Sequence, residues 1–128
     1  MTNERSAVIK IGNKEYELVL TTKATKEIAA KYGGMQNLGD KLLKTENFEM
    51  ALGEIVWLLT MLANQGIMIH NLENPDDKQD LLTEDIVELL TKPVDLASYK
   101  AAISQAMYLG TKRNIISEED PKNVEAAG

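Results

Sequence analysis

The sequence predicts a mainly α-helical protein, a small bundle of about five helices with an N-terminal β-hairpin. Apolar residues recur every three or four positions in several segments after residue 21, whereas residues 7–20 alternate at period two. A chain of 128 residues can bury a core as one domain without disulfides or metal. We therefore expect a single domain over residues 1–116, with the hairpin at residues 7–20, and a flexible acidic tail over residues 117–128.

The hairpin is predicted from two alternating segments, AVIKI at residues 7–11 and YELVL at residues 16–20. The Gly-Asn pair between them tolerates the positive φ angle of a tight turn. If Ile11 pairs with Lys14, the register also pairs Ala7 with Leu18, Ile9 with Tyr16, and Lys10 with Glu15. A lone hairpin is marginal in water, so its apolar face should pack on helices. That face comprises Ala7, Ile9, Ile11, Tyr16, Leu18 and Leu20.

Two helices are expected before the middle of the chain. Thr21 or Thr22 is a suitable N-cap for a helix that runs through Tyr32, and the Gly-Gly pair at positions 33 and 34 ends it. A second, short helix is expected where Met35, Leu38 and Leu42 recur, with Thr45 or Asn47 as the cap of the next helix.

The stretch at residues 48–65, FEMALGEIVWLLTMLANQ, is the predicted central helix. One face carries Phe48, Leu52, Ile55, Leu59 and Leu62. The opposite side is also apolar, because Met50, Trp57 and Met61 line up there. A helix that is apolar nearly all round is either central in a bundle or shared with a partner. Met50, Trp57 and Met61 are therefore the candidate partner-binding or self-association residues. We favour the alternative that the last helices of the chain cover them, because Tyr99, Ile103 and Met107 offer a matching stripe.

The second half of the chain is predicted to contain a loop and two further helices. After Gly66 and the apolar residues 67–69, the polar stretch HNLENPDDKQD at residues 70–80 has no sustained period and predicts a loop. Thr83 should cap a helix with acidic residues in its first turn. Its expected buried residues are Ile86, Val87 and Leu90. Pro93 ends that segment, and Asp95 should cap the last helix. One face of the last helix carries Leu96, Tyr99, Ile103, Ala106, Met107 and Gly110.

The residues needed for catalysis or for binding a cofactor are scarce. The chain has no cysteine and a single histidine, His70, which has no second His or Cys to complete a metal site. The acidic residues between Asp76 and Asp85 do not have the spacing of a calcium loop, and no glycine-rich phosphate loop is present. We therefore expect no enzymatic activity, no cofactor and no metal.

The charge distribution disfavours nucleic acid as a partner, and the apolar pattern disfavours a membrane. The net charge is −6, and residues 73–128 hold twelve acidic and six basic side chains, a balance that disfavours nucleic acid. The apolar run at residues 55–63 is about half of the ~20 residues needed to cross a bilayer, so we expect no membrane span. The sequence MTNERSAV does not have a signal-peptide pattern, which favours the cytoplasm.

The segment IGNKEYELVLTTKATKEIAAKYGGMQNL resembles the start of the tail assembly chaperones of long-tailed (siphovirus-type) phages and prophages of Gram-positive bacteria. The shared pattern is a hairpin of the form G-x-K-E-Y-x-L, then a helix that ends in K-Y-G-G. The similarity extends through Ile55–Ala63 and Leu82–Leu90 to the small-residue helix before the tail. The resemblance implies a mostly helical, non-catalytic protein of the host bacterial cytoplasm. Such a protein binds the tape measure protein, helps recruit tail tube subunits and does not stay in the mature virion.

Three hypotheses of function follow from these observations. The first is a phage tail assembly chaperone, which agrees with the scarce catalytic residues and the excess of apolar helix surface. The second is a structural or connector protein of the phage virion. The third is a small metal-dependent enzyme that uses the acidic loop. A large tape measure gene directly downstream would favour the first, whereas copies in purified virions would favour the second.

Overall fold

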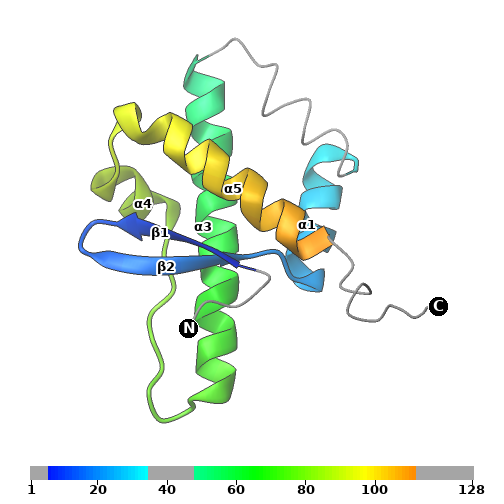
Figure 1. Cartoon of the computed structure of the whole chain (residues 1–128), viewed down its shortest axis with the longest axis vertical. Helices are drawn as coiled ribbons and strands as arrows, with labels where there is room; N and C mark the ends of the chain where they lie inside the picture. The colour runs from blue at the N-terminus through cyan, green and yellow to red at the C-terminus, as the bar shows by residue number, and fades with distance from the viewer. Residues whose placement is uncertain (1–5, 35–47, 112–128) are drawn as a thin grey trace, which may run out of the picture.

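The computed structural model describes residues 6–34 and 48–111. They form a mainly helical fold with an N-terminal antiparallel hairpin, as predicted (Figure 1). The elements are β1 (Ser6–Ile11), β2 (Lys14–Val19), α1 (Thr22–Tyr32), α3 (Phe48–Glu73), α4 (Glu84–Leu90), the 3₁₀ helix η1 (Pro93–Asp95) and α5 (Leu96–Thr111). These residues contain four α-helices, one fewer than expected. The helix predicted around Met35, the caps at Thr45 or Asn47 and the tail after residue 116 lie outside them.

The hairpin has the predicted register. Ile11 pairs with Lys14, Ile9 with Tyr16, and Ala7 with Leu18. Gly12 has φ 63°, the left-handed conformation that the tight turn requires. Among the helices, β2 packs mainly against α3, and β1 packs mainly against α5. Both strands therefore lie across the two long helices, as expected for a hairpin that cannot be stable alone (Figure 1).

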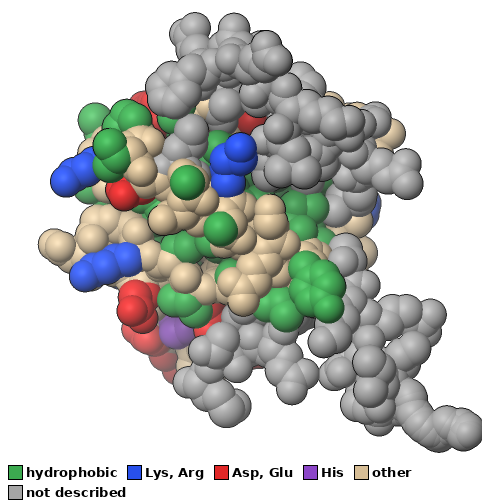
Figure 2. Space-filling model, turned by 45° about the horizontal axis from the view of Figure 1, so that its top comes forward, with side chains coloured by type: hydrophobic (Ala, Val, Ile, Leu, Met, Phe, Trp, Pro, Cys, Tyr) green, Lys and Arg blue, Asp and Glu red, His purple; other side chains and the backbone are tan. Residues whose placement is uncertain are grey.

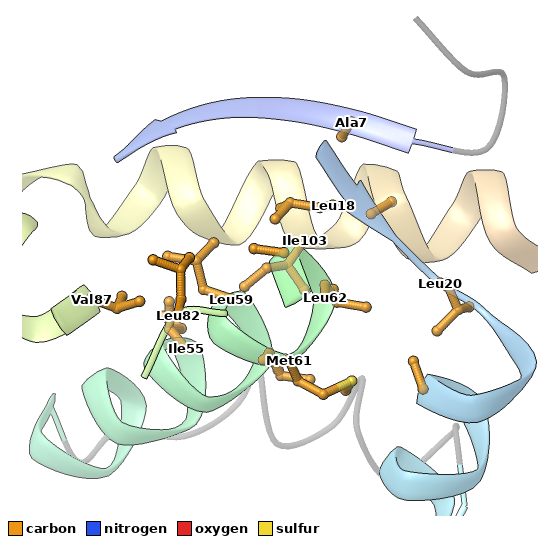
Figure 3. Close-up of a cluster of buried hydrophobic side chains, with 14 of the residues drawn as sticks. Ala7, Leu18, Leu20, Ile55, Leu59, Met61, Leu62, Leu82, Val87 and Ile103 are labelled. Carbon is orange, nitrogen blue, oxygen red and sulfur yellow. The ribbon is translucent and has the colours of Figure 1, made fainter. Parts of the chain in front are cut away.

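The hydrophobic core lies between the hairpin, α3 and α5. α3 contributes the predicted face, and Ile55, Leu59 and Leu62 are buried. Figure 3 shows them beneath Ala7 and Leu18 of the hairpin and close to Ile103 of α5. The side chains of Phe48 and Leu96 are outside the described part, so their predicted burial is not addressed.

Two glycines allow main chains to approach closely in this core. A Cβ atom placed on Gly66 of α3 would lie 2.7 Å from the carbonyl oxygen of Glu17 in β2. A Cβ on Gly110 of α5 would overlap the side chain of Leu20. Real Cβ atoms do not come this close to such groups, so the sequence needs glycine where β2 crosses α3 and where α5 passes Leu20.

α1 is fixed at both ends by the predicted signals. The Thr21 hydroxyl accepts a hydrogen bond from the amide of Ala24 at 3.0 Å, as an N-cap does. Gly33 ends the helix with φ 78° and donates its amide to the carbonyl of Ala29 at 2.8 Å. The Thr21 hydroxyl also donates to Oε1 of the buried Gln65, which joins the start of α1 to α3.

α3 continues to Glu73, so residues 70–73 of the predicted loop are helical, and the loop that the sequence predicts begins only at Asn74. Ile67 is buried, and the helix ends only before Asn74 and Pro75, because a residue that precedes proline disfavours helical geometry. Within the described residues, Leu52–Glu73 is long and apolar enough to cross a membrane by length and composition, and 50% of its most apolar window is buried in the fold. The apolar part of α3 is therefore longer than the run at residues 55–63, from which no membrane span was expected. A core helix passes the same test, so these two criteria do not assign α3 to a membrane.

The connection from α3 to α4 runs back along α3 and is held by two asparagines. Asn64 accepts from the amide of Leu82 at 2.7 Å and donates to its carbonyl at 2.9 Å. Asn71, two turns later, makes the same pair of bonds to Gln79, at 2.8 and 3.0 Å. Each asparagine therefore replaces the main-chain partner that an extended segment lacks. This arrangement places Leu82 in the core.

α4 begins at the predicted cap, where the Thr83 hydroxyl accepts from the amide of Ile86 at 3.1 Å. Val87 is fully buried, but Ile86 and Leu90 are exposed, so two of the three predicted buried positions are wrong. α5 begins directly after Asp95. On its predicted face, Ile103 and Ala106 are buried, and Tyr99 and Met107 pack partly against the core.

Candidate partner-binding surfaces

The structure separates the three residues predicted to bind a partner. Met61 is only 8% exposed and belongs to the core. Trp57 is half-buried and meets Tyr32 of α1 edge to face, with ring centroids 6.2 Å apart. Met50 lies in α3, but its side chain is outside the described part. Met61 could therefore meet a partner only after the elements around it move.

α1 supplies the contacts that shield Trp57. Besides the Tyr32 ring, the ammonium group of Lys31 lies 4.8 Å from the centroid of the Trp57 ring, within reach of a cation–π interaction. Tyr32 also donates its hydroxyl to Glu54 of α3. The sequence favoured the last helices as the cover, because Tyr99, Ile103 and Met107 offer a matching apolar stripe. The structure instead gives Trp57 its aromatic and cationic contacts from the helix that ends in Lys31 and Tyr32.

An exposed apolar surface lies on α4. Ile86, Leu89 and Leu90 are 39%, 83% and 50% exposed, and their spacing puts them on one side of the helix, with Leu90 next to the buried Val87. We call these three residues the α4 stripe. Leu90 lies against the hairpin turn, with its Cδ1 atom 3.4 Å from where a Cβ on Gly12 would be. The stripe therefore sits at the end of the molecule that carries the turn, and α1 lies at the opposite side (Figure 1).

Sequence reasoning missed the α4 stripe, although a signal for it exists. Ile86, Val87, Leu89 and Leu90 point in directions that span about 160° of the circumference of a helix, a wide arc for so short an element. A two-turn helix that packs against the fold on one side cannot bury all four. The prediction was correct for Val87, which is buried, and wrong for Ile86 and Leu90, which are exposed.

α4 also carries three acidic residues, of which Asp85 borders the α4 stripe and Glu84 and Glu88 lie on the opposite side of the helix. Glu84, Asp85 and Glu88 are all exposed, and α4 itself contains no Lys or Arg. Asp85 lies one turn before Leu89, on the same side of the helix. The first basic residue after the helix is Lys92. The stripe thus has one carboxylate, that of Asp85, at its edge.

A hollow of about 430 Å³ lies on another side of α4, between α3, α4 and the start of α5. Its walls are mainly apolar, with charges from Glu88 and Lys92. It is lined by Leu52, Gly53, Ile55, Val56, Leu59, Glu88, Thr91, Lys92, Pro93 and Tyr99. Burial raises the pKa of the Tyr99 phenol, and the charge of Asp95 and a long hydrogen bond to it, at 3.5 Å, add to the effect.

His70 contacts Asp77 of the acidic loop, and these contacts hold the loop against α3. His70 Nε2 lies 2.8 Å from the carbonyl oxygen of Asp77 and 3.5 Å from its carboxylate. Figure 2 shows acidic side chains gathered beside the histidine. In residues 6–34 and 48–111, no group of three or more His, Cys, Asp or Glu side chains is placed to hold a metal ion. The imidazole thus ties the loop after Pro75 back to α3.

No known family model, curated protein or solved structure matches the chain.

Proposed function

We propose that this protein is a non-catalytic assembly chaperone of phage tail morphogenesis. In this proposal it binds the tape measure protein in the host bacterial cytoplasm, helps recruit tail tube subunits and leaves before the virion is complete. Two things support the proposal. The first is the resemblance of the hairpin and first helix, G-x-K-E-Y-x-L followed by K-Y-G-G, to tail assembly chaperones. The second is the α4 stripe, which is the observation that carries the proposal.

The α4 stripe has the properties of a surface that holds a client reversibly. Complete burial of a fully exposed aliphatic side chain of this size contributes about 1.5–3 kcal/mol before the costs of association, and Ile86 and Leu90 would contribute less because they are already partly covered. Three such side chains therefore favour binding by a few kcal/mol, which suits a chaperone that must release its client. A permanent structural subunit commonly buries a larger apolar interface.

Co-expression with the tape measure protein of the same phage or prophage tests the proposal. We expect the tape measure protein, or fragments that tile it, to be insoluble alone and soluble when this protein is present. The soluble material should contain both proteins after purification through a tag on either one. Equal solubility of every fragment with and without this protein would reject the proposal. Stoichiometric copies in purified virions would favour a connector role instead.

A further inference from the structure

We infer that the free edge of β1 binds an extended segment of another protein, which joins the hairpin as a third strand. In the described part of the chain the sheet has two strands, so each strand has one edge without a neighbouring strand. The added segment lies in a hollow of about 500 Å³ between β1 and α5. This inference goes beyond the proposed function and does not depend on it, because main-chain hydrogen bonding defines the occupant.

The register of the hairpin shows which main-chain groups of β1 face the free edge. Ile11 and Lys14 adjoin a two-residue turn, so this pair exchanges both of its main-chain hydrogen bonds. Along an antiparallel ladder, such pairs alternate with pairs that exchange no hydrogen bond. The pairs that contain Val8 and Lys10 are of the second kind. The amide and carbonyl groups of these two residues are therefore directed away from β2.

The two edges of the hairpin differ in what covers them. On β2, the carbonyl oxygen of Glu17 lies against α3, since it is the atom that a Cβ on Gly66 would meet at 2.7 Å. On β1, no hydrogen bond from elsewhere in residues 6–34 and 48–111 reaches the main chain of Val8 or Lys10. A row of unpaired donors and acceptors on a strand is the template on which an extended peptide adds.

The hollow beside β1 has a wall that admits a main chain. Ser98 and Ala101 of α5 are small and exposed, so they leave space along the strand. Tyr99 and Ala102 are half-buried and make part of its surface apolar. In Figure 1, β1 lies between β2 and α5, the arrangement in which a peptide can enter between a strand edge and a helix. The hollow is lined by Val8, Ile9, Lys10, Asp95, Ser98, Tyr99, Ala101, Ala102 and Gln105.

The side chains around the edge define the sequence of the occupant. A strand directs successive side chains to opposite faces of a sheet. On the face toward α5 they would meet the half-buried Ile9 and Tyr99, so we expect apolar residues at every second position. On the other face they would lie beside Val8 and Lys10, where an acidic side chain next to Lys10 brings opposite charges together. The occupant is thus an extended segment with alternating apolar residues and an Asp or Glu between them.

Two features argue against a second copy of this chain as the occupant. α5 packs against β1, so a second β1 strand could enter the hollow only together with its own α5. Lys10 is also of the residue type that proteins place on edge strands to prevent pairing between identical edges. A separate extended segment has neither restriction.

Binding of a designed peptide to the full chain tests the inference. The probe is a labelled peptide of about nine residues, within the usual length of a strand, with Val at every second position and Glu or Thr between them. A second peptide has Lys in place of each Glu. In fluorescence anisotropy titrations we expect the Glu peptide to bind, more weakly as salt rises, and the Lys peptide to bind less tightly. Tighter binding of the Lys peptide would contradict the contact with Lys10.

Two N-methylated forms of the Glu peptide test the main-chain pairing directly. One carries methyl groups on the amides of its Val residues, and the other carries them on the amides of the residues between. Successive amides in a strand point to opposite edges, so only one of the two sets faces β1. Methylation of that set should weaken binding about tenfold or more, whereas methylation of the other should leave it unchanged. Equal effects of the two sets would overturn the inference.

Matched variants locate the site on β1. Lys10→Gln should weaken binding of the Glu peptide and reduce its dependence on salt. Lys14→Gln is the control, because Lys14 is an exposed lysine of the same hairpin that does not line the hollow, and it should leave the affinity unchanged. Both substitutions keep the main chain, and circular dichroism melts check that the fold is retained. Equal binding by the two variants would place the peptide elsewhere.

Amide hydrogen exchange of the full chain, followed by nuclear magnetic resonance, tests whether the edge is free. Without peptide, the amides of Val8 and Lys10 should exchange fast, and those of Ile9 and Ile11 slowly, because only the latter are bonded to β2. Saturation with the Glu peptide should slow the exchange of Val8 and Lys10. Slow exchange of both in the free chain would overturn the inference, because another part of the chain or a second copy would already cover the edge. Unchanged fast exchange with bound peptide would also overturn it.

Discussion

Gly66 looks destabilising in the sequence, but the packing of β2 on α3 requires it in the structure. In a helix interior, glycine is less favourable than alanine by about 0.5–1 kcal/mol, so both Gly53 and Gly66 look like weak points of α3. The structure separates them. A Cβ on Gly53 would meet nothing within 4 Å, whereas a Cβ on Gly66 would lie 2.7 Å from the carbonyl oxygen of Glu17.

Alanine at these two positions should therefore change stability in opposite directions. Gly66→Ala forces β2 away from α3 and should lower the free energy of unfolding by about 1–3 kcal/mol, the range for overpacked sites. Gly53→Ala should raise it by about 0.5–1 kcal/mol. Urea unfolding followed by circular dichroism measures both. Stabilisation by both substitutions would contradict the close contact between β2 and α3.

Tyr99 makes a prediction about alkaline pH. Because burial, and then Asp95, raise its pKa above the ordinary tyrosine value of 10.0, the folded chain holds the phenol proton more tightly than the unfolded chain does. The resulting contribution to stability is present below pH 10 and is lost as the pH rises through the folded pKa. Tyr99→Phe removes this dependence. Thermal melts from neutral pH to pH 11 should show the unmodified chain losing stability relative to the variant only above about pH 10. A constant difference across the range would be inconsistent with the raised pKa.

At the scale of elements, two asparagines define the path of the connection between α3 and α4. Asn64 and Asn71 are seven positions apart on one side of α3 and hold Leu82 and Gln79 in the same way. The two sites differ in exposure, because the bonds of Asn64 are partly buried and those of Asn71 are exposed. A lost hydrogen bond costs more where water cannot replace it.

Removing each amide should therefore have unequal effects. Asn64→Ala leaves the amide and the carbonyl of Leu82 without their partner and should cost about 1–3 kcal/mol. Asn71→Ala should cost about 0.5 kcal/mol or less, as for an exposed position. Chemical unfolding gives both values, and amide hydrogen exchange at Leu82 should accelerate only in the first variant. Equal losses would mean that the connection is held by something other than its asparagines.

Local signals explain which elements the sequence predicted correctly. The hairpin register follows from alternation around Gly12, and α1 and α4 begin at threonine caps, because these signals act between residues close in the chain. The end of α3 was predicted too early because the polar residues around Pro75 have no sustained period; one of these residues is Asn71. Its amide is instead used by the connection, a partner that becomes visible only in three dimensions. The exposure of Ile86 and Leu90 was missed for a related reason. Helical spacing indicates which residues share one side of a helix, but not whether another element covers that side.

At the scale of the whole molecule, the apolar circumference of the central helix was recognised, but the elements that cover it were not. Its length and composition required cover on nearly every side. Several short segments offered apolar side chains of similar size, so periodicity could not choose between α1 and α5 for Trp57. The choice depends on the chain path through Thr21 and Gln65, which join α1 to α3. The candidate partner-binding residues were predicted from the same pattern, and partner binding by them remains a prediction.

Truncation of Trp57 tests how much of the fold depends on the contact between α1 and α3. Because the side chain is half-buried against Tyr32 and Lys31, we expect Trp57→Ala to cost about 2–3 kcal/mol, below the ~3–5 kcal/mol of a fully buried aromatic residue. Trp57→Phe keeps a ring against Tyr32 and should recover part of the loss. Denaturant unfolding of both variants measures these values. A Trp57→Ala variant of unchanged stability that no longer holds its client would instead assign this side of α3 to partner binding.

The position of α3 in the chain also sets the order in which its surface is covered during synthesis. The hairpin and α1 are made before α3, whereas Leu82, α4 and α5 follow it. Thr111 is 38 positions after Glu73, so a ribosome adding ~5–20 residues per second needs about 2–8 s to complete α5 once α3 exists. During this interval the nascent chain carries an apolar helix of membrane-spanning length, and the hairpin is already available to shield the side that contains Gly66. Early placement of the hairpin thus reduces the apolar surface through which the longest helix can be captured by a membrane or another nascent chain during this interval.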